Sequence, residues 1–184
     1  MAITKYTKTC GKNIPGSSRI FFTEAANITS ITVTDDQVSA LTMESNTNFA
    51  EFAADLDSIK MTVEGKGSTS YSKTLKLEAK FSKKTKDLIA AESALADAVA
   101  CGVAVIRVDN NGYAWLSGYT LNDKNKRAYT KITSTFDSGT KPSDEDTAAY
   151  TITLEAEGFE DEMPFDATLT AAIVGGTAPF IDYN

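Results

Sequence analysis

Residues 58–81 of this chain are SIKMTVEGKGSTSYSKTLKLEAKF, and apolar and polar side chains alternate along most of that stretch. Alternation of this kind is typical of a β-strand that buries one face, and the glycine-containing residues 65–68 mark a turn between two such strands. We therefore predict a long, projecting β-hairpin over about residues 56–81, with Lys73 as the exception on its apolar face. That face carries Ile59, Met61, Val63, Tyr71, Leu75, Leu77, Ala79 and Phe81.

A hairpin of this length raises the question of what its strand edges contact. One interpretation is that both strands belong to the sandwich of their own domain and are bent there by bulges. The other is that the tip of the hairpin pairs with neighbouring copies, because an edge of unpaired amides favours strand addition. The sequence alone leaves both interpretations open.

The segment after the hairpin has the pattern of an amphipathic helix over about residues 85–101. Leu88 and Leu95 recur at helical spacing on one stripe, so this stripe should pack on a sheet. Thr85 is a suitable N-cap residue, and Gly102 is a suitable residue to end the helix. This is the one long helix that the sequence predicts.

A second hairpin begins directly after the helix. Residues 103–108 are almost entirely apolar, which is typical of a strand that is covered on both faces. Asn111 and Gly112 should supply the positive backbone φ angles of a tight turn, from which residues 113–119 return. Further strands are expected at residues 19–23, 28–34, 38–43, 128–136 and 149–159, with one or two helical turns at 167–174.

Together these elements define a mainly β protein of the α+β class. We expect a β-sandwich or a partly closed barrel with one flanking α-helix, because strands dominate and one long helix accompanies them. A chain of 184 residues fits a single domain, residues 1–184. Within it we expect an N-terminal arm at residues 1–17, an exposed loop at 137–147 and a C-terminal tail at 177–184.

The composition argues against several classes of protein. No apolar run approaches the ~20 residues that a membrane helix needs, and the N-terminus lacks the apolar core of a secretory signal. Cys10 and Cys101 are the only cysteines, and we expect both thiols to be unpaired, as in a reducing cytoplasm. The 18 Lys and Arg against 25 Asp and Glu give a net charge of −7, the wrong sign for gripping nucleic acid through its phosphates.

The chain also lacks the usual residues of catalysis. It has no histidine, which removes imidazole base chemistry and the common zinc sites. Two S-x-x-K matches, at 70–73 and 138–141, lack the helical geometry and the partner motifs of a serine–lysine nucleophile. Acidic residues at 144–146 and 160–162 lack the spacing of a calcium loop. We predict no catalytic, cofactor or metal residue and no enzyme; a histidine-free hydrolase using Ser and Lys or paired acids is a minor alternative.

Aromatic side chains supply a different alternative. Tyr113, Trp115 and Tyr119 alternate along the returning strand of the second hairpin. Such a row is more often part of a core or an interface, but an exposed row can stack on sugar rings. The alternative function is therefore a carbohydrate- or surface-binding β-module that uses this aromatic strand face.

The order of elements favours a further comparison: strands, a long amphipathic hairpin, a helix, then a hairpin and two strands. Four short motifs accompany this order, namely D-x-x-G at Asp109–Gly112, SG at Ser138–Gly139, SDE at Ser143–Glu145 and TITL at Thr151–Leu154. In these features the chain resembles the tail-tube family of tailed bacteriophages, which includes major tail tube proteins and the ring proteins of short tails. The resemblance covers about residues 18–160. The Trp115 strand and the aromatic tail depart from the family pattern, so the choice between a tube subunit and a single ring or adaptor stays open.

The resemblance implies a structural protein of the virion, assembled in the cytoplasm of the host bacterium. Hairpins from six or twelve subunits would close into an inner barrel through which the genome passes. The implied partners are further copies of the chain, other tail or portal-connecting proteins, and passing double-stranded DNA that is not specifically bound; no membrane is involved. A net negative charge suits a conduit, because a wall that repels phosphates lets DNA slide.

The hairpin then supplies two sets of candidate residues. Lysines on its faces mean that the lumen itself need not be acidic. The subunit-interface candidates are Ile59, Met61, Val63, Tyr71, Leu75, Leu77, Phe180, Ile181 and Tyr183. The lumen-facing candidates are Lys60, Thr62, Glu64, Lys76 and Glu78.

Overall fold

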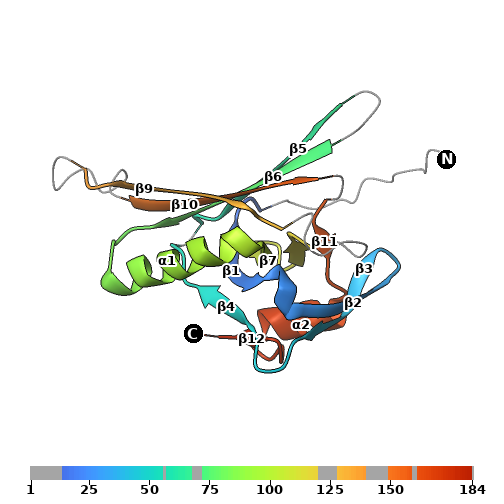
Figure 1. Cartoon of the computed structure of the whole chain (residues 1–184). Helices are drawn as coiled ribbons and strands as arrows, with labels where there is room; N and C mark the ends of the chain where they lie inside the picture. Colours follow the sequence, from blue (N-terminus) through green and yellow to red (C-terminus); the bar gives the residue numbers. More distant parts are fainter. Residues whose placement is uncertain are drawn as a thin grey trace.

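A computed structural model of the chain describes residues 14–55, 57–67, 72–119, 128–139, 149–158 and 161–183. Twelve strands and two α-helices lie in these residues, arranged as a four-stranded sheet, a six-stranded sheet and a two-stranded ribbon. Figure 1 shows the four-stranded sheet above the six-stranded sheet, with the ribbon and the short helix α2 below. The prediction of a mainly β, α+β fold is confirmed, and none of these described sheets closes into a barrel.

The six-stranded sheet has the order β11-β8-β7-β1-β4-β12. Its central strands β7 and β1 are antiparallel neighbours, and most of β7 is buried on both faces, as its almost entirely apolar sequence predicts. Both ends of the sheet are strands of two residues each. The strands are β1 (Ser17–Glu24), β4 (Phe49–Phe52), β7 (Val103–Asp109), β8 (Ala114–Ser117), β11 (Met163–Pro164) and β12 (Ile181–Asp182).

The four-stranded sheet has the order β5-β6-β10-β9, and every neighbouring pair is antiparallel. The predicted long hairpin forms its β5–β6 half, and β5 lies at the upper right of Figure 1. β10 pairs with β6 from Lys73 to Phe81, so β6 is a central strand of the sheet. The strands are β5 (Lys60–Lys66), β6 (Ser72–Phe81), β9 (Lys131–Asp137) and β10 (Ala149–Gly158).

One core lies between the two sheets and includes helix α1 (Lys86–Cys101). Alternate residues of β6 and β10, such as Leu77 and Leu154, point into it, and Leu95 and Val99 of α1 pack beside them. The helix begins where predicted, because the Thr85 hydroxyl oxygen accepts the Leu88 amide proton at 3.1 Å. Gly102 follows the helix with a φ of +96°, which suits glycine.

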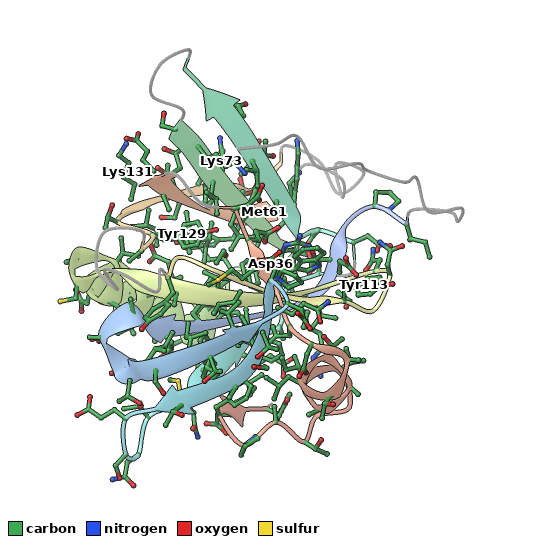
Figure 2. All side chains as sticks on the ribbon, turned by 90° about the vertical axis from the view of Figure 1, so that its right-hand side faces the viewer. Asp36, Met61, Lys73, Tyr113, Tyr129 and Lys131 are labelled. Atoms are coloured by element: carbon green, nitrogen blue, oxygen red, sulfur yellow. The ribbon has the colours of Figure 1, made fainter. Side chains whose placement is uncertain are left out.

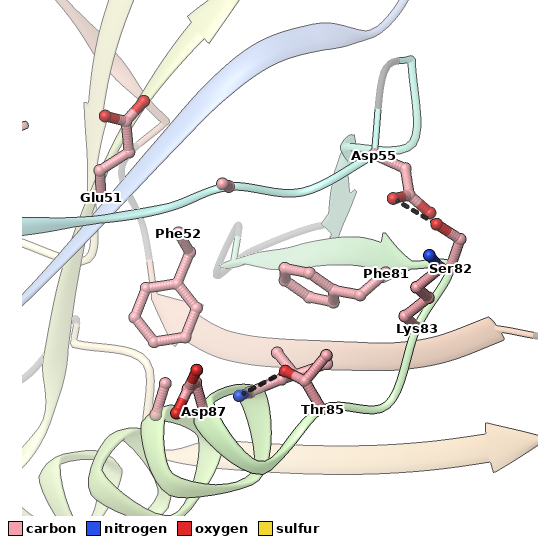
Figure 3. Close-up of a pocket in the computed structure, with 11 residues that line it drawn as sticks. Glu51, Phe52, Asp55, Phe81, Ser82, Lys83, Thr85 and Asp87 are labelled. Atoms are coloured by element: carbon pink, nitrogen blue, oxygen red, sulfur yellow. Dashed lines mark hydrogen bonds between the residues drawn. The ribbon is translucent and has the colours of Figure 1, made fainter. Parts of the chain in front are cut away.

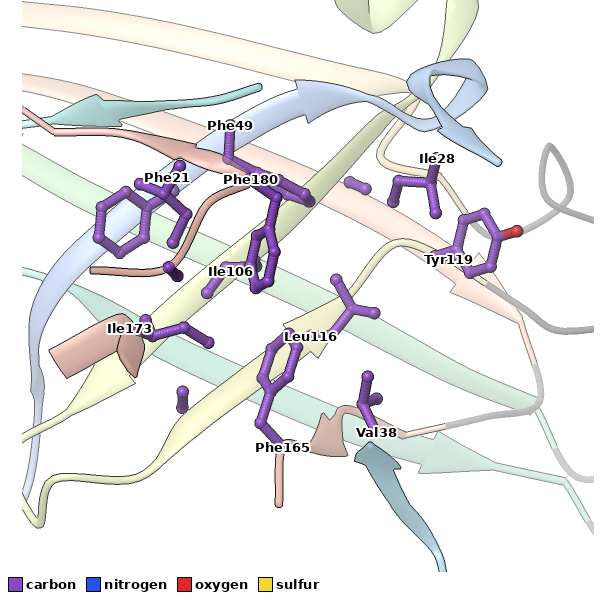
Figure 4. Close-up of a cluster of buried hydrophobic side chains, with 14 of the residues drawn as sticks. Phe21, Ile28, Val38, Phe49, Ile106, Leu116, Tyr119, Phe165, Ile173 and Phe180 are labelled. Carbon is purple, nitrogen blue, oxygen red and sulfur yellow. The ribbon is translucent and has the colours of Figure 1, made fainter. Parts of the chain in front are cut away.

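A second core covers the opposite face of the six-stranded sheet (Figure 4). Three elements cover this core: helix α2 (Ala167–Val174), the ribbon of β2 (Ile28–Thr34) and β3 (Gln37–Met43), and the C-terminal tail. The 3-10 turn η1 (Ala25–Asn27) leads from β1 into the ribbon. The side chains that meet here include Phe21, Phe49, Ile106, Leu116, Phe165 and Phe180.

Two details differ from the sequence-based expectations. In the turn of the second hairpin Gly112 has a positive φ of +82°, whereas Asn111 does not, because the Asp109 carboxylate accepts the Asn111 and Tyr113 amide protons and shapes the turn. The C-terminal tail, whose residues Phe180, Ile181 and Tyr183 were candidates for a subunit interface, is instead built into the fold of its own chain: β12 runs parallel to β4. The expected loop at 137–147 lies mostly outside the described residues.

Candidate assembly surface

The surface with the most distinctive composition is the outer face of the four-stranded sheet, which points away from both cores. Its cross-strand neighbours alternate in charge: Thr62 is opposite Lys76, which is opposite Glu155, which is opposite Lys131. The adjacent row pairs Lys60 with Glu78. The described members of this face include Lys60, Thr62, Glu64, Thr74, Lys76, Glu78, Lys80, Lys131, Thr133, Thr135, Asp137, Thr151, Thr153, Glu155 and Glu157.

This arrangement is a solvated face rather than a binding pocket. The ion pair from Lys131 Nζ to Glu157 Oε1 measures 3.1 Å, and both side chains are more than half exposed. Exposed pairs of this kind add little stability, because water and salt screen them. The mixture of lysine, glutamate and threonine therefore makes a hydrophilic surface without a concentrated charge of either sign.

The two edges of the same sheet are long and open. β5 and β9 are each seven residues long, and among the described residues no strand pairs with the outer edge of either one. A single bridge between Ser17 and Ile59 lies just before β5 begins. Backbone amides and carbonyls on the side of a strand that has no partner strand can accept another strand.

Apolar side chains lie along both open edges, on the side of the sheet that faces the core. Met61 and Val63 of β5 and Ile132 of β9 pack against the core between the sheets but stay partly exposed. Phe136 of β9 is 46% exposed, with the Lys84 ammonium 4.9 Å from its ring centre. Figure 2 labels Met61, on the core-facing side of the sheet, and Lys131, on its outer face. A strand added at either edge would cover apolar as well as polar groups.

The sequence-predicted lumen residues fall together on the outer face. Lys60, Glu64 and Lys76 are exposed, and Thr62 and Glu78 are partly exposed. The sequence did not show that β9 and β10 extend the same face, because alternation indicates which side a residue faces and not which strand lies next to it. Pairing from Glu78 to Thr153 and from Thr153 to Thr133 joins the two halves.

The predicted subunit-interface residues are divided by the structure. Ile59, Leu75 and Leu77 are buried in the core between the sheets, whereas Met61 and Val63 remain at the β5 edge. Tyr71 lies outside the described residues.

The tail residues proposed to dock on another subunit are covered by their own chain. Phe180 and Ile181 are buried in the second core, and the Phe49 amide donates to the Phe180 carbonyl at 2.9 Å. The Tyr183 ring lies 5.8 Å from that of Phe21, with Arg19 packed over it. Burial raises the pKa of Tyr183, and its hydroxyl donates to the carbonyls at the end of α2. The tail therefore completes the fold of its own subunit.

The predicted row of three aromatic residues does not form. Tyr113 is 59% exposed, but Tyr119 is buried in the second core. Trp115 is partly buried, with its Nε1 donating to Asp109 Oδ2 at 3.0 Å and Arg107 packed over its ring at 5.5 Å. The alternation breaks at Gly118, whose φ of +76° reverses the direction of Tyr119. Only Tyr113 and the exposed part of the Trp115 side chain are therefore accessible for stacking on a sugar ring.

A hollow lies where the chain enters α1 (Figure 3). It has a volume of about 490 Å³ and is lined by Phe52 and Phe81 together with polar residues at the helix start. Ser82 Oγ donates to Asp55 Oδ1 at 3.0 Å, and Thr85 caps the helix. The hydroxyl groups of Ser82 and Thr85 therefore both take part in hydrogen bonds within the fold. Within the described part of the chain, no group of three or more Cys, Asp or Glu side chains is placed to hold a metal ion.

Three further observations complete the description. No helix in the described ranges is long and apolar enough to span a bilayer. Cys101, at the end of α1, is an exposed free thiol. Comparison with family models, with curated proteins and with solved structures finds no match to this chain.

Proposed function

We propose that the chain is a structural subunit of a tailed bacteriophage virion, a tail-tube or tail-ring protein that assembles into a symmetric ring around the DNA conduit. The observation that carries the proposal is the four-stranded sheet. It combines a hydrophilic outer face with two seven-residue edges that no described strand covers. A ring of copies would pair these edges and place the outer face around a common axis.

The strand directions suit rotational assembly. Because β5, β6, β10 and β9 alternate in direction, β9 runs antiparallel to β5. A rotation about an axis along the strands keeps these directions, so β9 of one copy would meet β5 of the next in the antiparallel sense. The junction would then continue the antiparallel pattern of the sheet, and closure of the ring would leave no open edge.

The outer face also suits a surface past which DNA moves. Binding of DNA through its backbone depends on clustered Lys and Arg that displace counterions from several phosphates. Here three of the four lysine residues named on this face lie opposite a carboxylate on a neighbouring strand, namely Lys60 opposite Glu78, and Lys76 and Lys131 opposite Glu155. A wall of this composition would be wetted without holding the phosphates.

The experiment that tests the proposal is negative-stain electron microscopy of the purified protein over a concentration series, with light scattering for mass. We expect rings or stacked tubes with a central hole. A monomer of 19.7 kDa at every concentration, also after addition of purified tail or portal-connecting proteins, would overturn the proposal. The alternative, a carbohydrate- or surface-binding module, would then be tested by glycan binding with Tyr113→Ala as the matched variant.

A further inference from the structure

A groove beside the six-stranded sheet combines exposed apolar side chains with an acidic surrounding. It lies between the turn of the second hairpin, the start of β3 and helix α2, and its volume is about 860 Å³. We propose that this groove binds a segment of a partner protein in which an apolar anchor residue stands next to Lys or Arg residues. The lining residues that carry the argument are Gln37, Tyr113, Trp115, Pro164, Thr170 and Val174.

Large apolar side chains are exposed along this groove. Tyr113 is 59% exposed and Val174 is 44% exposed. Trp115 adds the exposed part of its indole, and Arg107, packed over the ring, and Pro164, its partner across the strands, hold it in place. Clustered exposed apolar side chains mark interaction sites, and Tyr and Trp are frequent anchors of protein interfaces. The groove therefore has the composition of a site for an apolar side chain.

The groove offers few polar side-chain groups to a ligand. The Trp115 Nε1 proton is already donated to a carboxylate, and the Thr170 hydroxyl donates to the Phe165 carbonyl at 3.3 Å. The Gln37 amide and the Tyr113 hydroxyl are the other polar side-chain groups of the lining. A sugar ring carries several hydroxyls, and each one needs a partner when it is buried. The lining therefore favours an apolar anchor over a sugar.

The half of the molecule that holds the groove is acidic. It comprises the six-stranded sheet, the ribbon, α2 and the tail, in residues 14–55, 103–119 and 161–183. These residues include eleven Asp and Glu but no lysine and only two arginines. Both arginines are already paired with a glutamate, as Arg19 with Glu51 and Arg107 with Glu162. The described lysines lie instead in β5, β6 and β9 and around the start of α1.

Two of these carboxylates directly precede a residue of the lining. Gln37 follows the turn of the ribbon, in which Asp35 and Asp36 are both exposed. Asp36 and Tyr113 are both labelled in Figure 2, which views the molecule from this end. A lysine or arginine next to an apolar anchor would meet carboxylates here. An acidic segment, a nucleic acid or an anionic lipid surface would be repelled.

Tryptophan fluorescence tests the proposal directly, because the single tryptophan of the chain, Trp115, lines the groove. Dilute full-length protein is titrated with three synthetic peptides, each acetylated and amidated: KLFKLK, its acidic counterpart ELFELE, and KSSKSK, which lacks apolar side chains. We expect KLFKLK to change the Trp115 fluorescence saturably, with an affinity that falls as salt is added. The other two peptides should bind at least about tenfold more weakly.

Two variants locate the binding in the groove. Val174→Lys places a charge there and should weaken KLFKLK binding by about tenfold or more. The matched control is Ile89→Lys, because Ile89 is similarly exposed, at 45%, but lies on α1 outside the groove. Asp35→Asn combined with Asp36→Asn should weaken binding by about two- to tenfold. Asn also adopts the positive φ of +51° and +61° found at these positions, so the turn should persist.

Other outcomes would overturn the proposal. Without a saturable change from KLFKLK, or with equal binding of ELFELE, the groove does not recognise a basic apolar segment. Equal losses in Val174→Lys and Ile89→Lys would place the binding elsewhere. Weakened self-association in Val174→Lys but not in Ile89→Lys would identify a second copy as the occupant. Tighter KLFKLK binding after Lys5→Glu with Lys8→Glu would identify the N-terminal segment of the same chain. Peptide binding by dilute protein needs no ring, so it is tested separately from the proposed function.

Discussion

The two larger sheets of this chain differ in the length of their edge strands. The six-stranded sheet is covered on both faces by apolar cores and ends in two-residue strands, β11 and β12. The four-stranded sheet is covered on one face, and no described strand pairs with the outer side of its seven-residue edge strands β5 and β9. Short edge strands are a common protection against unwanted pairing. Among the described residues the edges of the four-stranded sheet lack this protection, and the proposed pairing of copies rests on this difference.

The strongest test of this comparison is to protect the open edge artificially. We expect Val63→Lys, which places a charge on the apolar side of β5, to abolish ring assembly, because the added strand would have to bury that charge. The folded monomer should survive, since Val63 is only partly buried. Light scattering measures the assembly, and circular dichroism checks the fold.

The control for this variant is Thr153→Lys, which adds the same charge at a central strand of the outer face. It should assemble like the wild type. Assembly of Val63→Lys at wild-type concentrations would contradict a role for the β5 edge. A deletion of residues 60–76 is a less informative variant, because it removes buried Leu75 and unpairs part of β10.

A second test compares one ion pair from each sheet. Arg107 of β7 and Glu162 form a bidentate pair at 2.6 Å, with side-chain exposures of 12% and 7%. Glu162→Ala would leave the guanidinium largely buried without its counter-charge, and we expect the free energy of unfolding to fall by about 3–5 kcal/mol. Urea denaturation of dilute protein measures this change.

The matched control is Glu157→Ala, which breaks the exposed pair with Lys131 on the four-stranded sheet. Its cost should be about 0–1 kcal/mol. Equal losses in the two variants would show that the exposed face is more structured in solution than its contacts indicate.

The two faces of the four-stranded sheet give a third test with neighbouring residues. Leu77 is buried between the sheets, and Leu77→Ala should lower the free energy of unfolding by about 2–5 kcal/mol. Lys76 points to the outer face, so Lys76→Ala should change it by only about 0.5 kcal/mol. Similar urea midpoints for the two variants would contradict the assignment of faces.

Elements with a local signal could be predicted closely from the sequence. The strand Ile28–Thr34 and the helix Ala167–Val174 have the predicted bounds, the helix because Asp166 caps it by accepting the Leu169 amide proton. Strands β4 and β12 were missed. They are short, lack alternation and form through pairing of Phe49 with Ile181, a partner that local pattern cannot indicate.

For the candidate surface too, the sequence predicted the features that depend on local pattern and missed those that depend on distant segments. Alternation in the long hairpin correctly grouped Lys60, Thr62 and Lys76 on one polar face. It could not show that β9 is the other edge of that sheet, because strand order depends on contacts between distant segments. The same limit explains why Phe180 and Ile181 were expected at a subunit interface. The sequence of an apolar tail does not indicate whether its own chain or another subunit covers it.

The smallest expected effect concerns the boundary between the two sheets, where Tyr129 is fully buried. Its hydroxyl and that of Ser117 are hydrogen-bonded at 3.0 Å. Tyr129→Phe leaves the buried Ser117 hydroxyl without this partner, so we expect the free energy of unfolding at pH 7 to fall by about 1 kcal/mol. Urea denaturation at a series of pH values measures both this loss and its pH dependence.

The pH dependence follows from the pKa of Tyr129, which burial raises well above the usual value. Below a pH of about 10 the phenol is protonated in both the folded and the unfolded chain. Above it, the unfolded chain releases the proton and the folded chain does not, so this residue lowers wild-type stability by about 1.4 kcal/mol per pH unit. Tyr129→Phe lacks this loss, and the gap between the two proteins should close as the pH rises from 9 to 11. A gap that stays constant over that range would show that the hydroxyl reaches water in solution, and that the two sheets separate more readily at this point than their shared core indicates.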